Sequence, residues 1–397
     1  MADIDDLWFK IDKKTGEKVP SARHGRGRRW AARYRDDLGQ QRSPTFKKKV
    51  DAERYLARIQ TDLSRGTYID PKAGKITVRE FAQQWLGGLT NDPSTRRVVE
   101  LRIRLHVLPA LGDLQLKALK PSAVQSWLRG LQNELAANTV KAIYAHLSTL
   151  LNAAVDDGLI IRNPCSARSV RPPAAELRRV TPWPAEHVLA VREALPADRR
   201  AMVDAGAGLG LRQGEILGLA AEDIDWDRRI VHVRRQVKIL DRQLVFAPPK
   251  GGKEREVPLP DTVSARFSAH VEAWPPRKVT LPWREPTSDR TVTASLLFTS
   301  SSVKALRSDY VNPAIWQPAL TRVGVPLGRE NGMHALRHWY ASVQLDGGTS
   351  IKALSEYLGH ADAAFTLRVY THLMPAGEDR ARKAVDGVLR VPAGSAF

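Results

Sequence analysis

Cysteine is nearly absent from this 397-residue chain, and long apolar runs are missing altogether. The single cysteine, Cys165, excludes an intrachain disulfide and a cysteine-rich metal site, and it fits a reducing, cytoplasmic setting. No run of about 18 apolar residues occurs, so no membrane span is expected. The N-terminal sequence MADIDDLWFK is acidic and lacks an apolar core segment, so it is not expected to be a secretory signal.

Acidic residues are also in the minority. The chain has 62 lysines and arginines against 43 acidic residues, which gives a formal net charge of +19 and a pI near 10.2. Such a balance is the electrostatic footprint of a nucleic-acid-binding protein, although charge alone leaves open a basic protein without that partner. The length of 397 residues allows two or three domains with their own cores.

The stretch 334–372 has the densest pattern of helical periodicity and reactive side chains. Two amphipathic helices are predicted over 334–346 and 350–358, because a Gly-Gly pair between them ends the first helix and lets the chain turn. A third apolar-periodic run follows over 363–373 and contains Tyr370 among polar neighbours.

The chemistry of this stretch suggests phosphoryl transfer. His334 and Arg337 are three residues apart, so they share one face of a helix. Arginine is the side chain that grips phosphate with two parallel hydrogen bonds. A tyrosine such as Tyr370 can form a covalent intermediate when its proton has an acceptor and nearby cations favour its anion.

Five short motifs occur in a fixed order along the chain. They are Gly-Leu-Arg-Gln-Gly-Glu at 210–215, Pro-Lys-Gly-Gly-Lys-Glu-Arg-Glu-Val-Pro-Leu at 249–259, His-Ala-Leu-Arg-His at 334–338, Leu-Gly-His at 358–360 and Tyr-Thr-His at 370–372. In this order they resemble the signature of the tyrosine recombinases, the family of phage integrases. The resemblance extends over nearly the whole chain and is sharpest over 205–375.

The resemblance implies a role for each motif residue. Arg212 and Arg337 would hold the non-bridging oxygens of a phosphodiester while Tyr370 attacks phosphorus and forms a 3′-phosphotyrosine. Lys250, in a β-hairpin, would protonate the leaving 5′-hydroxyl. His334 would accept the tyrosine proton or bind a phosphate oxygen, His360 would hold phosphate, and Glu215 would orient a basic group.

Alternatives remain open for two of these roles. Lys253 lies three residues after Lys250 at the same hairpin tip and is the second candidate for the general acid. Tyr340 and Tyr357 are rival nucleophiles, but both fall in predicted helices where packing in the core is the ordinary role of tyrosine.

The pair His334 and His338 has the spacing of two ligands in a zinc-binding His-Glu-x-x-His motif. The residue after His334 is Ala335, so the general-base glutamate of that motif is missing and no metal is expected. His338 is assigned a structural role. No cofactor is expected either, because the catalytic region has no glycine-rich phosphate loop of the Lys-Ser/Thr type.

The expected fold class is mainly α with small antiparallel β-sheets, an α+β protein of three domains. Residues 1–75 would form a small sheet with a helix, resembling an arm-type DNA-binding domain with its linker. Residues 76–170 would form a helical core-binding bundle, 171–182 a linker, and 183–397 the catalytic domain with its β-hairpin. Within that last range, we expect an aperiodic surface insertion over 275–290 and a final helix over 378–389.

The N-terminal segment has a net charge of +8, from 19 basic and 11 acidic residues over 1–75. Alternation over 29–35 predicts a half-buried strand with aromatic residues on one face and arginines on the other, followed by a strand over 42–46 and a helix over 50–63. The arginine face either enters a DNA groove or is an ordinary solvated surface. The candidate DNA contacts are Arg29, Arg33 and Arg35 here, and Arg96, Arg97 and Lys141 in the helical bundle.

The resemblance implies a site-specific recombinase of the phage-integrase type, working as a homotetramer through a Holliday junction. Its partners would be duplex DNA with core and arm sites, together with a directionality factor or a host DNA-bending protein. No association with a membrane is expected. Two alternatives are a transposon or resolution recombinase with the same chemistry and a DNA-binding relative that has lost catalysis. The expected location is the cytoplasm, with the nucleoid as the site of action.

Overall fold

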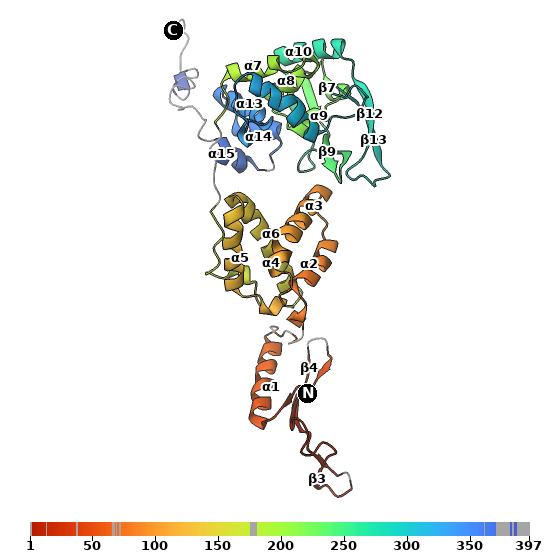
Figure 1. The fold of residues 1–397 in the computed structure, drawn as a ribbon, viewed down its shortest axis with the longest axis vertical. Coiled ribbons are helices and arrows are strands. Elements are labelled where there is room, and N and C mark those ends of the chain that lie inside the picture. Colours follow the sequence, from red (N-terminus) through yellow and green to blue (C-terminus); the bar gives the residue numbers. More distant parts are fainter. Residues whose placement is uncertain are drawn as a thin grey trace, which may run out of the picture. The chain divides into compact units, whose positions relative to one another are not determined.

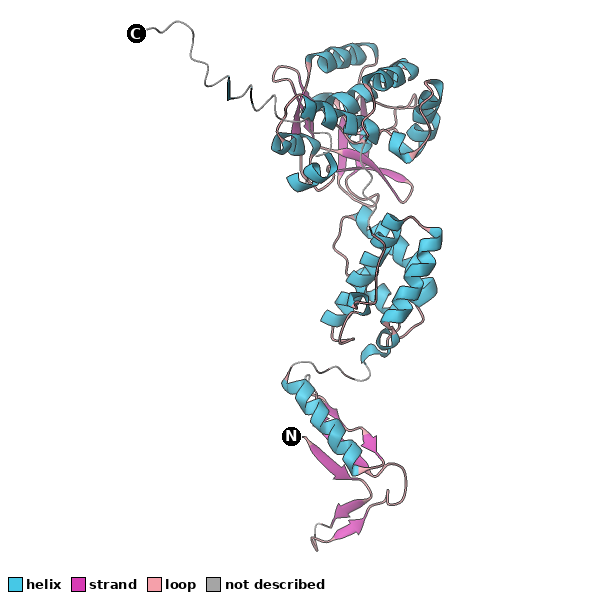
Figure 2. Cartoon of the chain, turned by 90° about the vertical axis from the view of Figure 1, so that its left-hand side faces the viewer, coloured by secondary structure: helices cyan, strands magenta, loops and turns pink. Residues whose placement is uncertain are grey.

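The computed structural model describes most of the chain, as Figures 1 and 2 show. The described residues are 2–12, 14–36, 39–65, 68, 70, 73–174, 181–360, 362–370, 382, 385 and 386. Contacts between residues divide the chain into two compact units, Met1–Glu176 and Leu177–Phe397. Most of the helix expected over 378–389 and half of the linker expected over 171–182 lie outside the described residues.

The first unit begins with a small antiparallel sheet centred on β4 (Trp30–Arg35). Its alternating pattern buries Ala32 and Tyr34 against helix α1, as predicted, while Arg33 stays exposed. Strands β1, β5 and β6 all pair antiparallel with β4. The bounds are Asp3–Asp6 for β1, Gln41–Arg42 for β5, Thr45–Phe46 for β6 and Lys49–Ser64 for α1.

Two details of this sheet differ from the prediction. The acidic N-terminal residues form β1, which pairs Asp3 with Arg33 and Asp6 with Trp30 in register. The strand expected over 42–46 is instead two short strands separated at Pro44, which has no backbone N–H to donate to a ladder. A separate hairpin, β2 (Phe9–Ile11) and β3 (Lys18–Pro20), also was not predicted.

The rest of the first unit is helical, as predicted for residues 76–170. The Thr77 side chain and Glu80 form a capping box, which starts α2. A π-helical segment, Ile103–Val107, joins α3 to α4, so the chain stays helical from one to the other without a regular α-helical pattern. The bounds are Val78–Gly87 for α2, Pro93–Arg102 for α3, Leu108–Leu111 for α4, Pro121–Glu134 for α5 and Ala137–Asp156 for α6.

The second unit has helices and three small antiparallel sheets. The helices are α7 (Ala185–Ala194), α8 (Arg200–Leu209), α9 (Gln213–Leu217), α10 (Asp261–Ala273), α11 (Ser308–Val311), α12 (Gln317–Arg322), α13 (His334–Asp346), α14 (Ile351–Leu358) and α15 (Ala363–Tyr370). The strands are β7 (Ile224–Asp225), β8 (Ile230–Val233), β9 (Gln236–Leu240), β10 (Gln243–Ala247), β11 (Arg255–Pro258), β12 (Arg277–Pro282) and β13 (Thr291–Leu296). The sheet orders are β11-β8-β7, β10-β9 and β12-β13.

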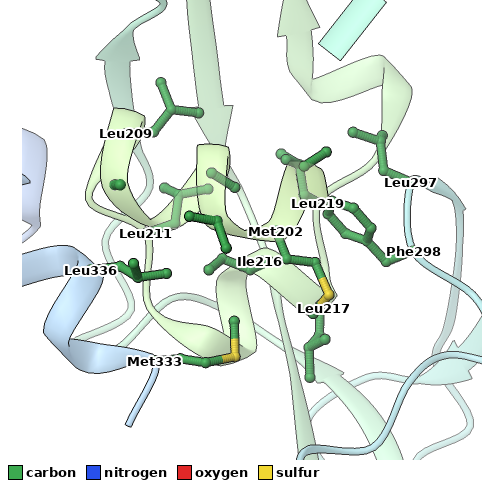
Figure 3. Packing of buried hydrophobic residues seen from close by; sticks show 14 of the residues in the cluster. Met202, Leu209, Leu211, Ile216, Leu217, Leu219, Leu297, Phe298, Met333 and Leu336 are labelled. Carbon is green, nitrogen blue, oxygen red and sulfur yellow. The ribbon is translucent and has the colours of Figure 1, made fainter. Parts of the chain in front are cut away.

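Helix α8 is the centre of this unit, because α7, α9, α10 and α13 all pack on it. Its small residues permit this close packing: a Cβ on Gly206 would lie 2.7 Å from Leu336 of α13. Figure 3 shows Met202 and Leu209 of α8 among Ile216 and Leu217 of α9 and the residues around them. This core holds the junction of α8 and α9, which carries Arg212, and the start of α13, which carries His334 and Arg337.

Two expectations for this unit were wrong. The segment 275–290 is not an aperiodic insertion, because β12 and β13 pair antiparallel over six residues each. The Lys250 turn does not close a hairpin, because β10 pairs with β9 whereas β11 pairs with β8. Prolines near the ends of β12 obscured the period-2 pattern of the β12–β13 pair. The pairing of β11 with β8 could not be predicted, because the partner of a strand is not encoded in the strand's own sequence pattern.

Candidate active site

Arg212 lies where α8 gives way to α9. Gly210 ends α8 with a φ of 63°, a left-handed conformation that favours glycine. Arg212 then precedes α9, and Glu215 folds back onto it: the carboxylate accepts from the Arg212 backbone N–H and from its Nη1, both at 2.9 Å. The Arg212 Nη2 donates to the Gly359 carbonyl oxygen at 3.1 Å, so the guanidinium is fixed at two of its nitrogens.

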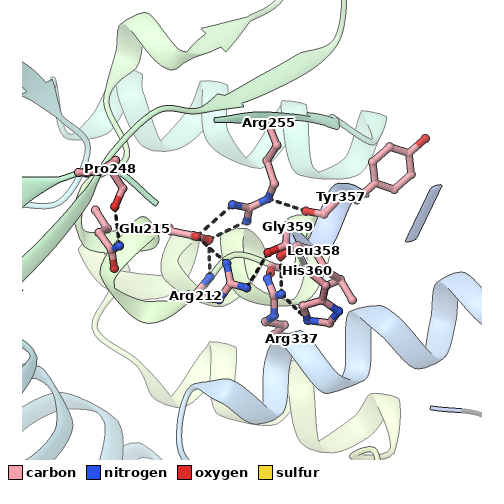
Figure 4. A network of polar contacts seen from close by, with 11 residues as sticks. Arg212, Glu215, Pro248, Arg255, Arg337, Tyr357, Leu358, Gly359 and His360 are labelled. Carbon is pink, nitrogen blue, oxygen red and sulfur yellow. Dashed lines mark hydrogen bonds and ion pairs between the residues drawn. The ribbon is translucent and has the colours of Figure 1, made fainter. Parts of the chain in front are cut away.

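A second arginine, Arg255 at the start of β11, grips the same carboxylate (Figure 4). Its Nη1 and Nη2 donate to the two oxygens of Glu215 at 3.0 and 2.7 Å, and its Nε donates to the Tyr357 carbonyl at 2.6 Å. Burial raises the pKa of Glu215, but the hydrogen bonds and charges of Arg255 and Arg212 outweigh it and hold the pKa at about 2. Glu215 is therefore ionised at neutral pH.

Arg337 is one of the most deeply buried charged groups of the unit, at 1% exposure. It projects from α13, and its Nη1 donates to the Gly210 carbonyl at 2.7 Å, while its Nη2 donates to the Leu358 carbonyl. Burial and the charge of Arg212 lower the pKa of Arg337 to about 9. The side chain still carries its proton at neutral pH, so two guanidinium cations meet beside the end of α14.

His360 follows α14 and completes this cluster. Its Nε2 lies 3.0 Å from Nη2 of Arg337, and its Nδ1 lies 2.8 Å from Oγ1 of the buried Thr366. Because a guanidinium can only donate, Nε2 is the acceptor and Nδ1 carries the proton. Burial and the charge of Arg337 lower the pKa of His360 to about 3, so the ring is neutral.

Tyr370 ends α15 with its hydroxyl inside the protein, at 1% exposure. The hydroxyl lies 2.8 Å from Nδ1 of His338, which comes from α13. Burial raises the pKa of Tyr370 to about 12 against the opposing charges of Arg337 and Arg212. Burial and the charge of Arg337 lower the pKa of His338 to about 4. The pair is thus a protonated phenol beside a neutral imidazole.

His334 and Lys250 lie at the outer side of the cluster. The His334 ring meets the His338 ring edge-on at a centroid distance of 4.6 Å, and it keeps an exposed side. The pKa of His334 is lowered to about 4, mainly by burial and further by the charges of neighbouring groups that include Lys250. Lys250 and Lys253 are both exposed in the turn between β10 and β11.

The fold therefore gathers the six catalytic candidates in one unit, whereas the candidate DNA contacts lie in the other. Arg96 and Arg97 are exposed on α3, and Lys141 is exposed near the start of α6. The arginines of the N-terminal sheet are largely occupied. Arg29 donates two hydrogen bonds to Asp6, Arg33 forms an ion pair with Asp5, and Arg35 donates to the Gly39 carbonyl.

Sequence reasoning missed three residues of the site: Arg255, His338 and Thr366. Arg255 lies inside the motif at 249–259, two residues before the Val-Pro-Leu run. An arginine on the same strand as the buried Val257 could have marked Arg255 as a site residue. His338 is one helical turn from His334, so it was visible as a candidate on the same face. Nothing local in the sequence distinguishes Thr366 from a packing residue.

Comparison with known sequences agrees with this geometry. The family model described as "Phage integrase family" matches residues 179–376, which contain all six catalytic candidates. The chain belongs to the phage integrase family, whose members are the tyrosine recombinases. A second model, "Phage integrase, N-terminal SAM-like domain", matches residues 77–132. Membership confirms the resemblance and the expectation of an enzyme that cleaves and rejoins DNA.

Curated relatives match over most of the chain. A "Tyrosine recombinase XerC-like" protein of Caldanaerobacter subterraneus subsp. tengcongensis is 25% identical over 356 residues, which cover 83% of this chain and 87% of the relative. An "Integrase" of Streptomyces ambofaciens is 25% identical over 359 residues, 87% of this chain and 88% of the relative. The family therefore extends well beyond the catalytic unit.

Solved structures confirm the fold. The Tn1549 transposon integrase in complex with transposon right end DNA is similar with a TM-score of 0.65 and 20% identity, over 79% of this chain and 99% of that one. A lambda integrase dimer bound to a COC′ core site gives a TM-score of 0.56 and 17% identity, over 85% and 91%. The expected mainly α architecture with small antiparallel sheets is thus the architecture of this family.

In the part of the chain that the structure describes, no cluster of three or more histidine, cysteine, aspartate or glutamate side chains could hold a metal ion. None of the helices in that part combines the length and the apolar character that a membrane span needs.

Proposed function

We propose that this family member is a site-specific DNA recombinase that cuts and rejoins duplex DNA through a 3′-phosphotyrosyl intermediate on Tyr370. One observation carries the assignment: the buried Tyr370 hydroxyl lies 2.8 Å from Nδ1 of the neutral His338 ring. His338 lies on α13, the helix that also carries Arg337. A tyrosine poised beside a base and a cation is the arrangement that nucleophilic attack on a phosphodiester needs.

The two arginines would stabilise charge on the non-bridging oxygens. Arg212 uses two of its five N–H donors inside the protein, at Nη1 and Nη2. Arg337 uses three of its five, one at Nη1 and two at Nη2. Three donors of Arg212 and two of Arg337 therefore remain for phosphate oxygens. Donors held rigidly in a low-dielectric site stabilise a transition state more than a solvated pair would.

The step balances within the residues of the site. As the bond from Oη of Tyr370 to phosphorus forms, the phenolic proton passes to Nδ1 of His338 and the bond from phosphorus to O5′ breaks. The leaving oxygen takes a proton from the ammonium group of Lys250, with Lys253 as the alternative donor. His334, next to His338, is the second candidate acceptor for the phenolic proton. His360 was expected to hold a phosphate oxygen, but its Nε2 accepts from Arg337 and its Nδ1 faces Thr366, so it would act by orienting Arg337 toward that oxygen.

We propose that the remaining parts of the chain bind DNA. Residues 76–170 would hold the core site, using Arg96, Arg97 and Lys141, and residues 1–75 would bind arm-type sites, with 171–182 as the linker. The formal charge of +19 and the family match at 77–132 support this division. A solved lambda integrase tetramer bound to a Holliday junction, similar with a TM-score of 0.54, supports a homotetramer.

A transposon recombinase with the same chemistry is the second candidate, favoured by the likeness to the Tn1549 transposon integrase. A relative that has lost catalysis is disfavoured, because Tyr370, both arginines and the histidines are all present. The reaction is proposed to proceed in the cytoplasm on nucleoid DNA, without a cofactor. A directionality factor or a host DNA-bending protein would act as a further partner.

The test is a suicide substrate, a nicked duplex that loses a short strand after cleavage and so traps the intermediate. The crossover sequence is obtained from the DNA that flanks the gene. The wild-type protein is expected to form a covalent adduct in the presence of EDTA. Tyr370→Phe should bind the same duplex and form none, whereas the control Tyr357→Phe should react. Normal cleavage by Tyr370→Phe would refute the proposal.

A further inference from the structure

A basic loop, Ser21–Arg28, connects β3 to β4 in the N-terminal part of the chain (the stretch before β4 in Figure 1). Its sequence, Ser-Ala-Arg-His-Gly-Arg-Gly-Arg, contains three arginines and a histidine and no acidic residue. Residues 22–28 are all exposed. Neither the family matches nor the motifs of the sequence analysis assign this loop a role.

The loop is held in one shape despite its exposure. The indole N–H of Trp8 donates to the Arg26 carbonyl at 3.1 Å, and the Ser21 N–H donates to the Trp8 carbonyl at 2.8 Å. The His24 ring meets the Phe9 ring edge-on at 4.9 Å. Because the loop is already ordered, a ligand that binds it loses little affinity to ordering entropy.

Its cations are available, unlike those of the neighbouring strand. Arg29 and Arg33 are paired with Asp6 and Asp5. Arg23 and Arg26 have no acidic partner among the described residues, and the remaining loop arginine donates only to the uncharged Thr45 carbonyl. The loop therefore presents cations without an acidic partner among the described residues, whereas Arg29 and Arg33 of the predicted arginine face are paired with carboxylates.

Glycines flank Arg26 on both sides in the loop, so no side chain stands next to this arginine. Gly25 and Gly27 have φ values of 75° and 69°, which glycine adopts readily, and a Cβ on either would meet no atom within 4 Å. The backbone between the arginines is thus bare and faces open space. The minor groove of DNA, about 6 Å wide, is too narrow for a helix but admits arginine side chains carried on short non-helical segments.

We propose that Ser21–Arg28 is a minor-groove-binding loop that inserts Arg23 and Arg26 into duplex DNA. The inference rests on the proposed function for the identity of the ligand. A narrow A·T-rich minor groove has an enhanced negative potential and lacks the guanine amino group, so it favours these guanidinium groups. The N-terminal part of the chain then senses groove width as well as phosphate charge.

The experiment measures binding of the full chain to three labelled duplexes of equal length by fluorescence anisotropy. One duplex is A·T-rich, one is G·C-rich, and one is the G·C-rich duplex with inosine in place of guanine. Inosine removes the minor-groove amino group and leaves the major-groove pattern of guanine, so it isolates minor-groove contacts. The proteins compared are wild type, Arg23→Ala/Arg26→Ala, Gly27→Val and the control Arg54→Ala/Arg58→Ala.

The wild-type chain is expected to bind the A·T-rich and inosine duplexes more tightly than the G·C-rich one. Arg23→Ala/Arg26→Ala should lose that preference, and the slope of log K against log salt should shrink by about 2, because each released counterion contributes about 0.9. Gly27→Val keeps all the charges but disfavours the left-handed backbone, so it should reduce the preference too. The control, which removes two exposed charges of α1, should retain it.

Two results would overturn the proposal. Equal binding of all three duplexes by the wild-type chain would show that the loop does not read the minor groove. A uniform loss of affinity in Arg23→Ala/Arg26→Ala, with the preference intact, would reduce the loop to phosphate contact. Failure of the proposed recombinase chemistry would appear separately, as absence of the covalent adduct on the core-site suicide substrate in the wild-type chain.

Discussion

Arg255 binds through all three of its guanidinium nitrogens inside the protein, and only 7% of its side chain is exposed. It cannot turn toward a phosphate without releasing Glu215. Its role is therefore positional: it shares the carboxylate with Arg212 and so fixes where the Arg212 guanidinium points. Removing one partner of a buried ion pair is costly, because an unpaired charge remains.

Replacing Arg255 with lysine tests this role without removing the charge. Lysine cannot make the two parallel hydrogen bonds to Glu215, so Arg212 should shift and the cleavage rate should fall by about 10²-fold with DNA affinity little changed. The measurement is single-turnover cleavage of the suicide substrate at saturating protein. Arg266→Lys is the matched control, because Arg266 also pairs with a buried carboxylate, Asp204, in the same unit. Equal rates in the two variants would remove Arg255 from the account.

The depressed histidine pKa values predict the pH dependence of cleavage. The pKa values of His334 and His338 are lowered to about 4 and that of His360 to about 3, so all three rings are neutral at pH 6 and above. Acidification through pH 6.5 should therefore leave cleavage at subsaturating DNA unchanged, and the rate should fall only below about pH 5, as His338 loses its capacity to accept a proton. An inflection between pH 6 and 7 that disappears in His338→Asn would contradict these environments.

At the scale of single residues, Arg212, Arg337, His360 and Tyr370 could be proposed from the sequence because their motifs occur in a fixed order, and the fold places them in one unit. His334 was expected either to accept the tyrosine proton or to bind a phosphate oxygen, whereas the hydrogen bond of Tyr370 is to His338. Which of two imidazoles on one helical face reaches a tyrosine depends on the position of another helix, and local spacing does not determine it.

Among the elements, the junction of α8 and α9 is the most constrained. Gly210 must adopt a left-handed φ, and a Cβ there would lie 2.5 Å from Cδ1 of the buried Tyr340. Its carbonyl also accepts the hydrogen bond from Arg337, so the backbone here positions a catalytic candidate as well as ending a helix.

Gly210→Ala should therefore destabilise the protein more than a comparable change at an open site. Gly324 has a φ of 71°, and a Cβ there would meet nothing within 4 Å, so Gly324→Ala carries only the backbone cost of roughly 1–2 kcal/mol. The clash with Tyr340 should add about 1–3 kcal/mol for Gly210→Ala. Urea denaturation of the two variants measures the difference. Equal midpoints would mean that the backbone at Gly210 relaxes freely.

Elements with a long periodic pattern were predictable and short ones were not. Helices α13 and α1 were predicted because many residues in each follow one helical period. Strand β1 was missed because three of its four residues are aspartates, which are rare in strands. Ion pairs of Asp5 with Arg33 and of Asp6 with Arg29 offset that low propensity, and a local sequence pattern does not reveal such pairs.

Over the whole molecule, each part has a hydrophobic cluster of its own. Residues of the N-terminal sheet and α1 form one cluster, the helices from α2 to α6 form another, and the second unit has a large one around α8. The catalytic candidates all come from this last part. Chemistry and DNA affinity should therefore separate when the chain is shortened.

Deleting residues 1–75 tests that separation. The shortened protein should still form the covalent adduct with a core-site suicide substrate, because it keeps every catalytic candidate. It should lose footprints outside the core and show a shallower salt dependence, since fewer phosphates are neutralised. Footprints and integration identical to those of the full chain would reduce the N-terminal segment to a solubilising extension.

The central claim is that the Tyr370 hydroxyl becomes bonded to DNA, and mass spectrometry of the trapped adduct tests it most directly. After protease and nuclease digestion, the account predicts a nucleotide remnant on the peptide that contains Tyr370 and an unmodified Tyr340 and Tyr357. A remnant on either of those tyrosines, or a cleaved substrate with no protein attached, would contradict it.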